Sequence, residues 1–443
     1  MTSATAIAQT KSLPAGPALQ NSARLSKDTV IGSSATKGNL KTSAIKPSKP
    51  LGSDLALYLL TFGPGDHPFF KFGHDAIWLH DDFSGLDLVY NYGTFNFSSP
   101  WLILDFLKGK LTYWLSVDSL RATVASYSAE NRSIVAQKLN LTPQERLSLA
   151  RKLAINARLE NKYYKYDYYL DNCATRIRDI IDITIDGRLK ATATAKAQMT
   201  WRQHTLRHTA DNLPVYLGLH VIMGNYIDRN ISVWDEMFLP VKLQETIGKT
   251  EVITPTGEEP LVQSEFTLVT AARPVLRTSP PAWLIWFLLV GLALGGVFII
   301  LTLLAYRQHW RWAKVAVALI LAAAGLVSGL LGLIFVCLWA FTDHVVAFHN
   351  ENILQYAPWS LLLLPAAIRL LRGDMQVLPK IRSLLLVLVI GSLMGLLLKL
   401  LPWFNQQNFE FIALMLPFWV GLFVAIYLWE RSCQASTRHV SNL

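Results

Sequence analysis

Cysteine is scarce in this chain. Only three cysteines occur among 443 residues, at positions 173, 337 and 433. Cys173 is the only one before the long apolar runs that begin near residue 282, so no disulfide can form within that first part. Cys173 is therefore either a small apolar core residue or a reactive thiol.

Large apolar side chains are few in the first 50 residues. This stretch is rich in Ser, Thr, Ala, Gly and Lys, and it holds seven Lys or Arg against one acidic residue. Its composition predicts a disordered basic tail over residues 1–50, and a nucleic-acid-binding surface explains the net charge of +10 poorly. It also lacks an apolar core of the length of a secretory signal. Export would then depend on the first apolar helix or on a signal preceding residue 1.

Charged residues almost disappear from long runs after residue 282. Five segments have the length or apolarity of membrane-spanning helices, and the third is short and holds two prolines. Lys and Arg gather in every second connection between these segments, and we expect those connections to be cytoplasmic. The domain that precedes the first segment is then expected on the outer side of the membrane. The segments are 282–306, 315–341, 353–368, 381–398 and 411–429. The basic residues are Arg307, Arg311, Lys314, Arg369, Arg372, Lys380, Arg382, Arg431 and Arg438.

Short runs rich in aromatic and β-branched residues mark the region 51–275. Turn sequences such as GPGDHP and DDFSG separate them, and together they predict an antiparallel sheet. Ser99 followed by Pro100 predicts the start of a helix that ends near Gly109. The predicted strands lie within 54–62, 71–80, 86–97 and 111–119.

Two further helices follow the predicted strands. The first helix is predicted to begin with Thr142 as N-cap and Pro143 at its first position, and Glu145 completes a capping box with Thr142. The apolar face of that helix is predicted to hold Leu147, Ala150, Leu153, Ala154 and Ala157. The second helix begins at DNCATRIRD, where Asp171 or Asn172 can be the N-cap. Cys173 then falls in its first turn.

The first turn of a helix is a favourable place for a nucleophilic thiol. Its partial positive charge favours the thiolate, and its free N–H groups can bind an oxyanion. His74 is the candidate base, on an inward-looking strand row with Phe72, Ala76 and Trp78. Asn91 or Asp87 could orient its imidazole, with Asn91 preferred. The alternative is that Cys173 is a buried core residue and His74 a structural residue, because a single cysteine or histidine often has no catalytic role.

Several motifs resemble one known family when they are read in order. FGHDAIWL, VYNYGTFNF and DNCATRIRD are followed by MGNYIDRNISVWDEMFLPVKLQE and TDHVVAFHNENILQYAP. This succession is similar to the Lnb-type bacterial lipoprotein N-acyltransferases, and the resemblance runs from about Leu55 to the C terminus. The order of histidine before cysteine is also similar, more distantly, to lecithin:retinol acyltransferases and to permuted NlpC-type hydrolases.

The resemblance implies an α+β fold, a circularly permuted papain-like domain over 51–275 followed by about five transmembrane helices over 282–430. A cytoplasmic tail would cover 431–443. Cys173 would carry an acyl chain as a thioester, with His74 as its base. The chain would pass from a phospholipid to the N-terminal amine of a diacylglyceryl lipoprotein. The protein would lie in the bacterial inner membrane with this domain in the periplasm.

Other polar residues are candidates for substrate binding. Arg176 and Arg178 could hold a lipid phosphate, because a guanidinium suits its geometry; a solvated helix face is the alternative. His344 and Asn350, in a predicted outer loop, could position the headgroup or the amine, unless that loop is merely solvated. The spacing of acidic and histidine residues there matches no standard metal site, so no metal or cofactor is expected. A cysteine hydrolase and a non-enzymatic exported sensor or scaffold remain alternative functions.

Overall fold

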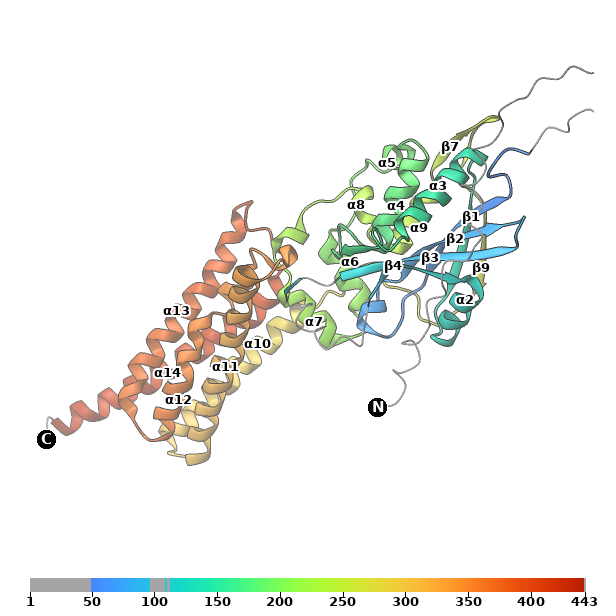
Figure 1. Ribbon diagram of the computed structural model, residues 1–443. Coiled ribbons are helices and arrows are strands. Elements are labelled where there is room, and N and C mark those ends of the chain that lie inside the picture. The colour runs from blue at the N-terminus through green and yellow to red at the C-terminus, as the bar shows by residue number, and fades with distance from the viewer. Residues whose placement is uncertain (1–48, 96–107, 110–111, 442–443) are drawn as a thin grey trace, which may run out of the picture.

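The computed structural model describes residues 49–95, 108–109 and 112–441. The predicted helix after Ser99 and nearly all of the predicted basic tail therefore lie outside the described residues. Within them, a sheet-rich domain stands at one end of the molecule and a helical region at the other (Figure 1). The mixed α+β class expected from the sequence is confirmed.

A seven-stranded antiparallel sheet organises the first domain, in the order β6-β4-β3-β2-β1-β5-β9. The four strands predicted from the sequence are neighbours in it, so the predicted antiparallel sheet is confirmed. The other three strands and a separate ribbon, β7 and β8, were not predicted. The bounds are β1 Leu55–Phe62, β2 His74–Asp81, β3 Leu86–Thr94, β4 Thr112–Ser119, β5 Ile134–Leu139, β6 Tyr163–Lys165, β7 Glu251–Thr254, β8 Gly257–Pro260 and β9 Val262–Val269.

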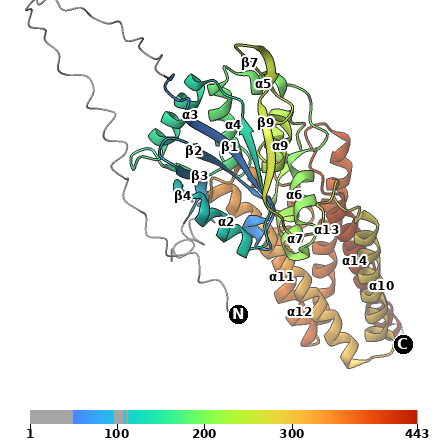
Figure 2. The same ribbon diagram turned by 90° about the vertical axis from the view of Figure 1, so that its right-hand side faces the viewer.

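Helices cover both faces of the sheet (Figures 1 and 2). On one face α4, α3 and α9 pack against β1, β2 and β3, and on the other α2 packs against β3, β4 and β9. The predicted capping box of α3 is confirmed, but Leu149 and Leu153 are its buried residues, and Leu147 is only half-buried. The bounds are α2 Leu120–Ala129, α3 Pro143–Asn156, α4 Cys173–Thr184 and α9 Pro240–Ile247.

A set of shorter helices follows α4 in the chain. Their polar residues Arg202, His220 and Asp228 are buried where the two parts of the molecule meet. These helices are α5 Arg188–Thr192, α6 Trp201–Thr209, α7 Leu213–Ile222, η4 Asn225–Asp228 and α8 Val233–Glu236.

Four helices of the second region are long and apolar enough to cross a membrane. The third segment predicted from the sequence is different: it belongs to a broken helix pair, Val345–Leu354 and Pro358–Leu371, bent by 50°. Pro358 begins the second half, where proline is tolerated but cannot continue a preceding helix. The long helices are α10 Leu284–Arg307, α11 Arg311–Phe341, α13 Leu378–Leu397 and α14 Phe409–Ser441; α12 is Leu363–Leu371.

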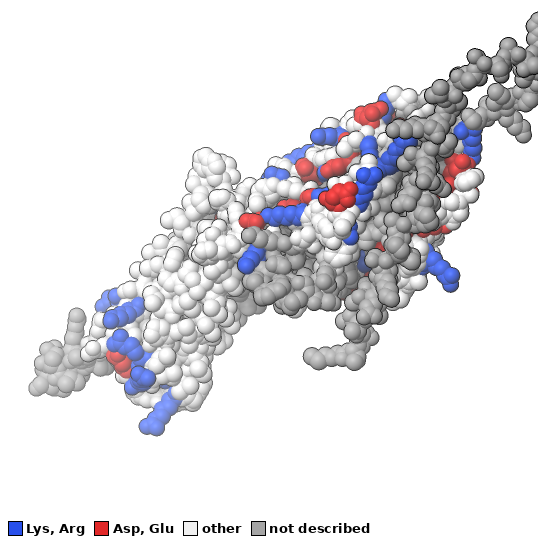
Figure 3. Space-filling model, viewed as in Figure 1, with Lys and Arg blue, Asp and Glu red and all other residues white. Residues whose placement is uncertain are grey.

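Lys and Arg gather at the end of the helical region that is farthest from the sheet domain, and its apolar middle is almost uncharged (Figure 3). The connections concerned follow α10 at Arg307 and α12 at Arg369. Basic connections are typical of the cytoplasmic side. This arrangement supports the predicted outer position of the sheet domain.

The end of α7 joins the two parts of the molecule. A helix leaves its last carbonyl groups unpaired, and here side chains from the membrane region bind them. Asn350 donates both amide hydrogens, to Val221 O and Ile222 O at 2.8 Å each, and Gln406 donates to Met223 O at 3.1 Å. Arg202 of α6 donates to His220 O at 3.0 Å.

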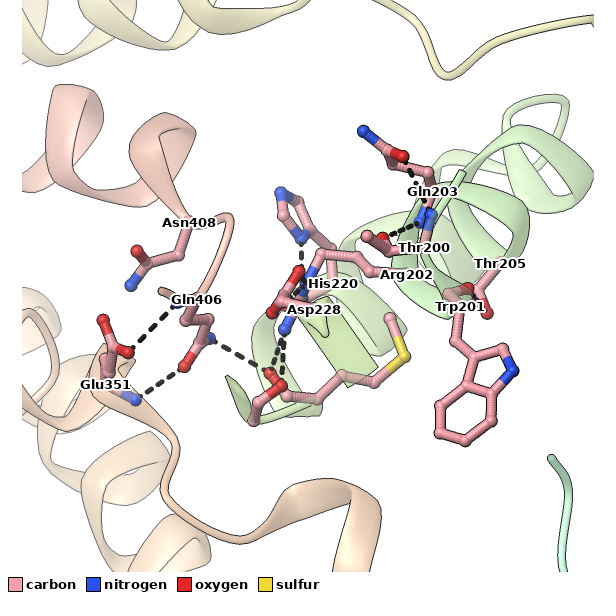
Figure 4. A network of polar contacts seen from close by, with 12 residues as sticks. Thr200, Trp201, Arg202, Gln203, Thr205, His220, Asp228, Glu351, Gln406 and Asn408 are labelled. Atoms are coloured by element: carbon pink, nitrogen blue, oxygen red, sulfur yellow. Dashed lines mark hydrogen bonds and ion pairs between the residues drawn. The ribbon is translucent and has the colours of Figure 1, made fainter. Parts of the chain in front are cut away.

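Buried charges surround the same junction (Figure 4). Arg202 and Asp228 form a fully buried ion pair at 2.8 Å, and Glu351 binds Lys399 in another buried pair. Burying charges is costly unless they are paired and hydrogen-bonded. The polar side chains of the junction therefore fix how the two parts dock.

Candidate active site

Cys173 is the first residue of α4, as the sequence predicted. Its N-cap is Asn172 rather than Asp171: Asn172 Oδ1 accepts from Thr175 N at 2.9 Å, and Thr175 Oγ1 accepts from Asn172 N at 2.8 Å. The Asn172 amide also donates to Tyr168 O and Phe238 O, at 2.8 and 2.9 Å. These bonds fix the first turn of α4 against two separate segments.

The thiol lies where two strands of the sheet part. The β2–β3 ladder runs from Asp81 only to Ile77, and the register of β3 on β4 shifts between Asn91 and Thr94. Gly93, in this bulge, has a φ of +89°, which favours glycine. A Cβ on Gly93 would lie 3.6 Å from Cys173 Cβ. The bulge therefore makes room for the start of α4 beside the sheet.

Backbone N–H groups surround the sulfur. Those of Asp75, Cys173 and Ala174 interact with it and favour the thiolate. Burial has the larger effect and, together with the Asp75 charge, raises the pKa of Cys173 to about 12. The resting group is therefore a neutral thiol, although the helix N-terminus by itself predicts a lowered pKa.

His74 is the first residue of β2, and its partner is Asn91 of β3. Burial and the nearby charge of Arg132 lower the pKa of His74 to about 3, against the opposing effect of the Asn91 hydrogen bond. Asn91 Nδ2 in turn donates to Asp118 Oδ2 at 3.2 Å. The imidazole is therefore neutral at physiological pH.

Asp87, the other candidate for orienting His74, lies elsewhere. Its Oδ1 accepts from Trp78 Nε1 at 2.7 Å and contacts His80 Nδ1 at 2.8 Å. The geometry therefore favours Asn91 over Asp87 as the partner of His74. Asp118, which holds the Asn91 amide, was not found from the sequence.

Two residues that follow His74 in the same strand row pack on the side of the sheet opposite to α4. Ala76 and Trp78 of that row pack with Phe62 beneath α2, whereas Cys173 packs with Ile77. Alternation along β2 sends Ala76 and Trp78 away from α4. That His74 is the base of Cys173 stays a prediction. What reaches the sulfur is the N–H of Asp75, the next residue after His74.

Asp75 points to the α4 side and is fully buried. Within the described part of the chain neither carboxyl oxygen has a hydrogen-bond partner of normal geometry, although the Thr61 hydroxyl lies nearby on the paired strand β1. Burial raises the pKa of Asp75 well above the usual value, which favours the protonated form of the carboxyl. Asp75 was not singled out from the sequence, although alternation from His74 places it on the face opposite to that histidine.

Aromatic side chains form the rest of the surroundings of the thiol. Tyr166 stacks on Tyr113 with ring centroids 4.1 Å apart, Tyr113 contacts Phe95 at 4.9 Å, and Phe95 contacts Phe69 at 5.6 Å. Phe69 is 44% exposed, whereas Cys173 is only 7% exposed. A continuous aromatic row therefore leads from the surface to the sulfur.

The two arginines of α4 are engaged with neighbouring residues. Arg176 forms a bidentate ion pair with Asp171, at 2.6 and 2.7 Å, and its guanidinium lies 3.6 Å from the centre of the Tyr164 ring. Arg178 binds Asp179 at 2.8 Å and Trp234 O at 2.9 Å. Their predicted contact with a lipid phosphate stays a prediction.

The predicted outer-loop residues lie between α11 and η6 Glu351–Leu354, where the membrane region contacts the first domain. Asn350 is 1% exposed and uses both amide hydrogens to bind α7. His344 is the N-cap of η5 Val345–Ala347, and the neighbouring Asp343 pairs with Lys165 at 2.9 Å. Asn350 therefore has a structural role here, and its binding of substrate, like that of His344, stays a prediction.

Comparison with known proteins identifies the first domain. A family model described as the Lnb N-terminal periplasmic domain matches residues 51–207, which hold β1 to β6, His74 and Cys173. No curated protein and no solved structure matched the chain. Residues 51–207 therefore match the Lnb N-terminal periplasmic domain, which supports the Lnb-type family, and the helices that follow are long and apolar enough to cross a membrane.

Proposed function

We propose that this protein is a lipoprotein N-acyltransferase that uses Cys173 as its nucleophile. The observation that carries the proposal is the position of Cys173 within the family domain. Its thiol lies at the first turn of α4, with three N–H groups directed at it. The same N–H groups can stabilise the negative charge that develops on an attacked carbonyl.

In the first step, the Cys173 sulfur attacks the carbonyl carbon of a phospholipid ester, and the thiol proton passes to the neutral imidazole of His74. Because the thiol pKa is about 12 and the imidazole pKa about 3, transfer before attack is unfavourable, and the proton moves as the C–S bond forms. The tetrahedral intermediate then expels the lipid alkoxide, which takes the proton from His74. A thioester and a lysophospholipid result.

In the second step, the N-terminal amine of a diacylglyceryl lipoprotein attacks the thioester carbonyl. His74 accepts a proton from this amine and returns it to the departing sulfur. An amide forms, the C–S bond breaks, and the Cys173 thiol is regenerated. The Asn91 side chain, hydrogen-bonded to His74, would keep the imidazole oriented, and Asp118 accepts a hydrogen bond from the Asn91 amide.

The fold supports a circularly permuted papain-like arrangement for residues 51–275. In chain order, the histidine strand β2 precedes the cysteine helix α4, which packs against the antiparallel sheet. The periplasmic domain and the helices agree with a place in the bacterial inner membrane. Both lipid substrates would then be held at the outer surface of the bilayer.

The aromatic row from Phe69 to Tyr166 suits entry of a fatty chain. An acyl chain can replace contacts between apolar rings at little cost, because it buries similar apolar surface. The thiol itself is covered, so the rings nearest to it must turn aside as the chain enters. The proposed acyl donor is therefore a lipid whose tail enters this row.

Mass spectrometry of lipoprotein N-terminal peptides tests the proposal. Cells that depend on this protein should carry N-acylated lipoproteins, and Cys173→Ala should abolish the modification. Asp87→Asn is the matched control and should retain it. If acylation persists in the Cys173→Ala cells, the proposal is wrong.

Purified full-length protein separates a transferase from a cysteine hydrolase. With phospholipid alone, a transferase should accumulate a thioester on Cys173 that neutral hydroxylamine releases. Free fatty acid formed without an acceptor amine would instead indicate a hydrolase, in which water attacks the thioester.

A further inference from the structure

Tyr164 presents a buried hydroxyl beside the proposed nucleophile. It is the central residue of β6 and pairs with Tyr113 of β4. Only 9% of the residue is exposed, and its Oη has no hydrogen-bond partner among the residues that the structure describes. Most buried polar groups in proteins are satisfied, so a buried hydroxyl without a partner points to an acceptor that arrives with the substrate.

The hydroxyl and the thiol border one small space over Gly93. A Cβ built on Gly93 would lie 3.9 Å from Tyr164 Oη, 3.6 Å from Cys173 Cβ and 3.8 Å from Tyr166 Cε2. Glycine has no side chain to fill this space. An acyl carbonyl attached to the sulfur can therefore project its oxygen toward Tyr164.

Arg176 fixes the orientation of the Tyr164 ring. Its guanidinium stacks on one face of the ring, and Asp171 holds it by two hydrogen bonds. Planar stacking of this kind restrains the ring. The hydroxyl is thus positioned before any substrate binds, as a donor to a developing charge should be.

We infer that Tyr164 is a catalytic residue whose hydroxyl donates a hydrogen bond to the carbonyl oxygen of the tetrahedral intermediate on Cys173. This inference rests on the proposed function. Tyr164 Oη would act beside the N–H groups of the α4 first turn. No proton is transferred, because the hydroxyl only stabilises the oxyanion and keeps its hydrogen.

Two reactions of the same thiol test the role. Acylation of Cys173 in the full-length protein by p-nitrophenyl butyrate passes through an oxyanion, whereas alkylation by iodoacetamide does not. Tyr164→Phe should slow acylation by about 10²–10³-fold, the effect of removing one oxyanion donor, and leave alkylation unchanged. Tyr92→Phe is the matched control: this buried hydroxyl already accepts a bond from Asn156 at 2.8 Å, so acylation should be unaffected.

Arg176→Gln gives a second, independent variant. It keeps the hydroxyl but removes the stacking cation, so acylation should fall by about tenfold and alkylation should not change. Acylation of Tyr164→Phe within threefold of the wild type overturns the inference. So does an equal loss of acylation and alkylation, which would indicate a damaged site.

The acylation results for the wild-type protein and for Tyr164→Phe test the proposed function and the role of Tyr164 separately. If the wild-type protein accepts the butyryl group but never a phospholipid acyl chain, phospholipid is not the donor. The role of Tyr164 would be unaffected by that result. Normal acylation of Tyr164→Phe would remove only that role.

Discussion

The backbone N–H of Asp75 interacts with the sulfur of Cys173, at the point where β2 and β3 part. A thiol can approach that N–H because the ladder between the two strands has ended. The same approach buries the sulfur, and burial outweighs the helix N-terminus in setting its pKa. This contact has direct consequences for reactivity.

Cys173 should react as a neutral thiol. Since burial raises its pKa to about 12, the thiolate fraction, and with it the rate of iodoacetamide alkylation, should rise about tenfold per pH unit from pH 7 to 9. Mass spectrometry of the Cys173 peptide measures this rate. A rate that is already constant below pH 7 would indicate a thiolate–imidazolium pair and contradict the structure.

Asn91→Ala should lower turnover by about 10- to 100-fold, because the neutral imidazole of His74 loses the group that orients it. His74→Ala should cost more, since the base itself is removed. Asp87→Asn is the control and should retain full activity. The rate of lipoprotein acylation in membranes is measured for each variant. An equal loss of activity in Asn91→Ala and Asp87→Asn would show that Asn91 does not orient His74.

Asp75→Asn should stabilise the protein at neutral pH. Burial raises the folded-state pKa of Asp75, so the folded protein keeps a proton that the unfolded chain releases. Stability is then highest below the unfolded pKa and falls as pH rises toward the folded pKa. Removing the ionisable group should raise the thermal midpoint by a few degrees at pH 7 and flatten its dependence on pH.

Tryptophan fluorescence of the full-length protein follows the midpoint. The control, Asp87→Asn, makes the same replacement at a half-exposed carboxyl and should leave the pH dependence unchanged. A lower midpoint for Asp75→Asn at every pH would mean that the carboxyl stabilises the fold.

Phe69→Glu should weaken the use of phospholipid. A charge at the exposed end of the aromatic row should repel an incoming fatty chain and lower kcat/KM for phospholipid by about tenfold or more. The short ester p-nitrophenyl butyrate should acylate Cys173 at the wild-type rate. Phe83→Glu, on an exposed turn, is the control, and equal behaviour of the two variants would remove the proposed route.

Lys399→Met should destabilise the junction by about 3–5 kcal/mol, because Glu351 would keep a buried charge without a partner. The double variant Glu351→Gln/Lys399→Met should recover much of that loss. Lys165→Met breaks the exposed pair with Asp343 and should cost less than about 1 kcal/mol. Thermal unfolding in detergent compares the four proteins, and equal effects of the two lysine variants would contradict a docking role.

The sequence determined the local features of this protein. Strand alternation, turn residues and capping boxes act between near neighbours, so β1 to β4, the start of α3 and the position of Cys173 on α4 could be predicted. The basic connections likewise predicted which end of the helical region lies far from the sheet domain. The third apolar segment was predicted as a short span with two prolines, and the bend between its two halves depends on packing that the sequence alone does not show.

Only the tertiary structure decided what surrounds the thiol. Asp75 reaches Cys173 where the β2–β3 ladder ends, and Tyr164 lies beside it on β6, which pairs with β4 at the sheet edge. Both positions depend on contacts between residues that are distant in sequence. The pKa of Cys173 follows from the same packing, since burial around a helix N-terminus can exceed the effect of its dipole. The hydrogen bonds from Asn350 to the end of α7 could not be predicted either, because they join residues that are distant in the sequence.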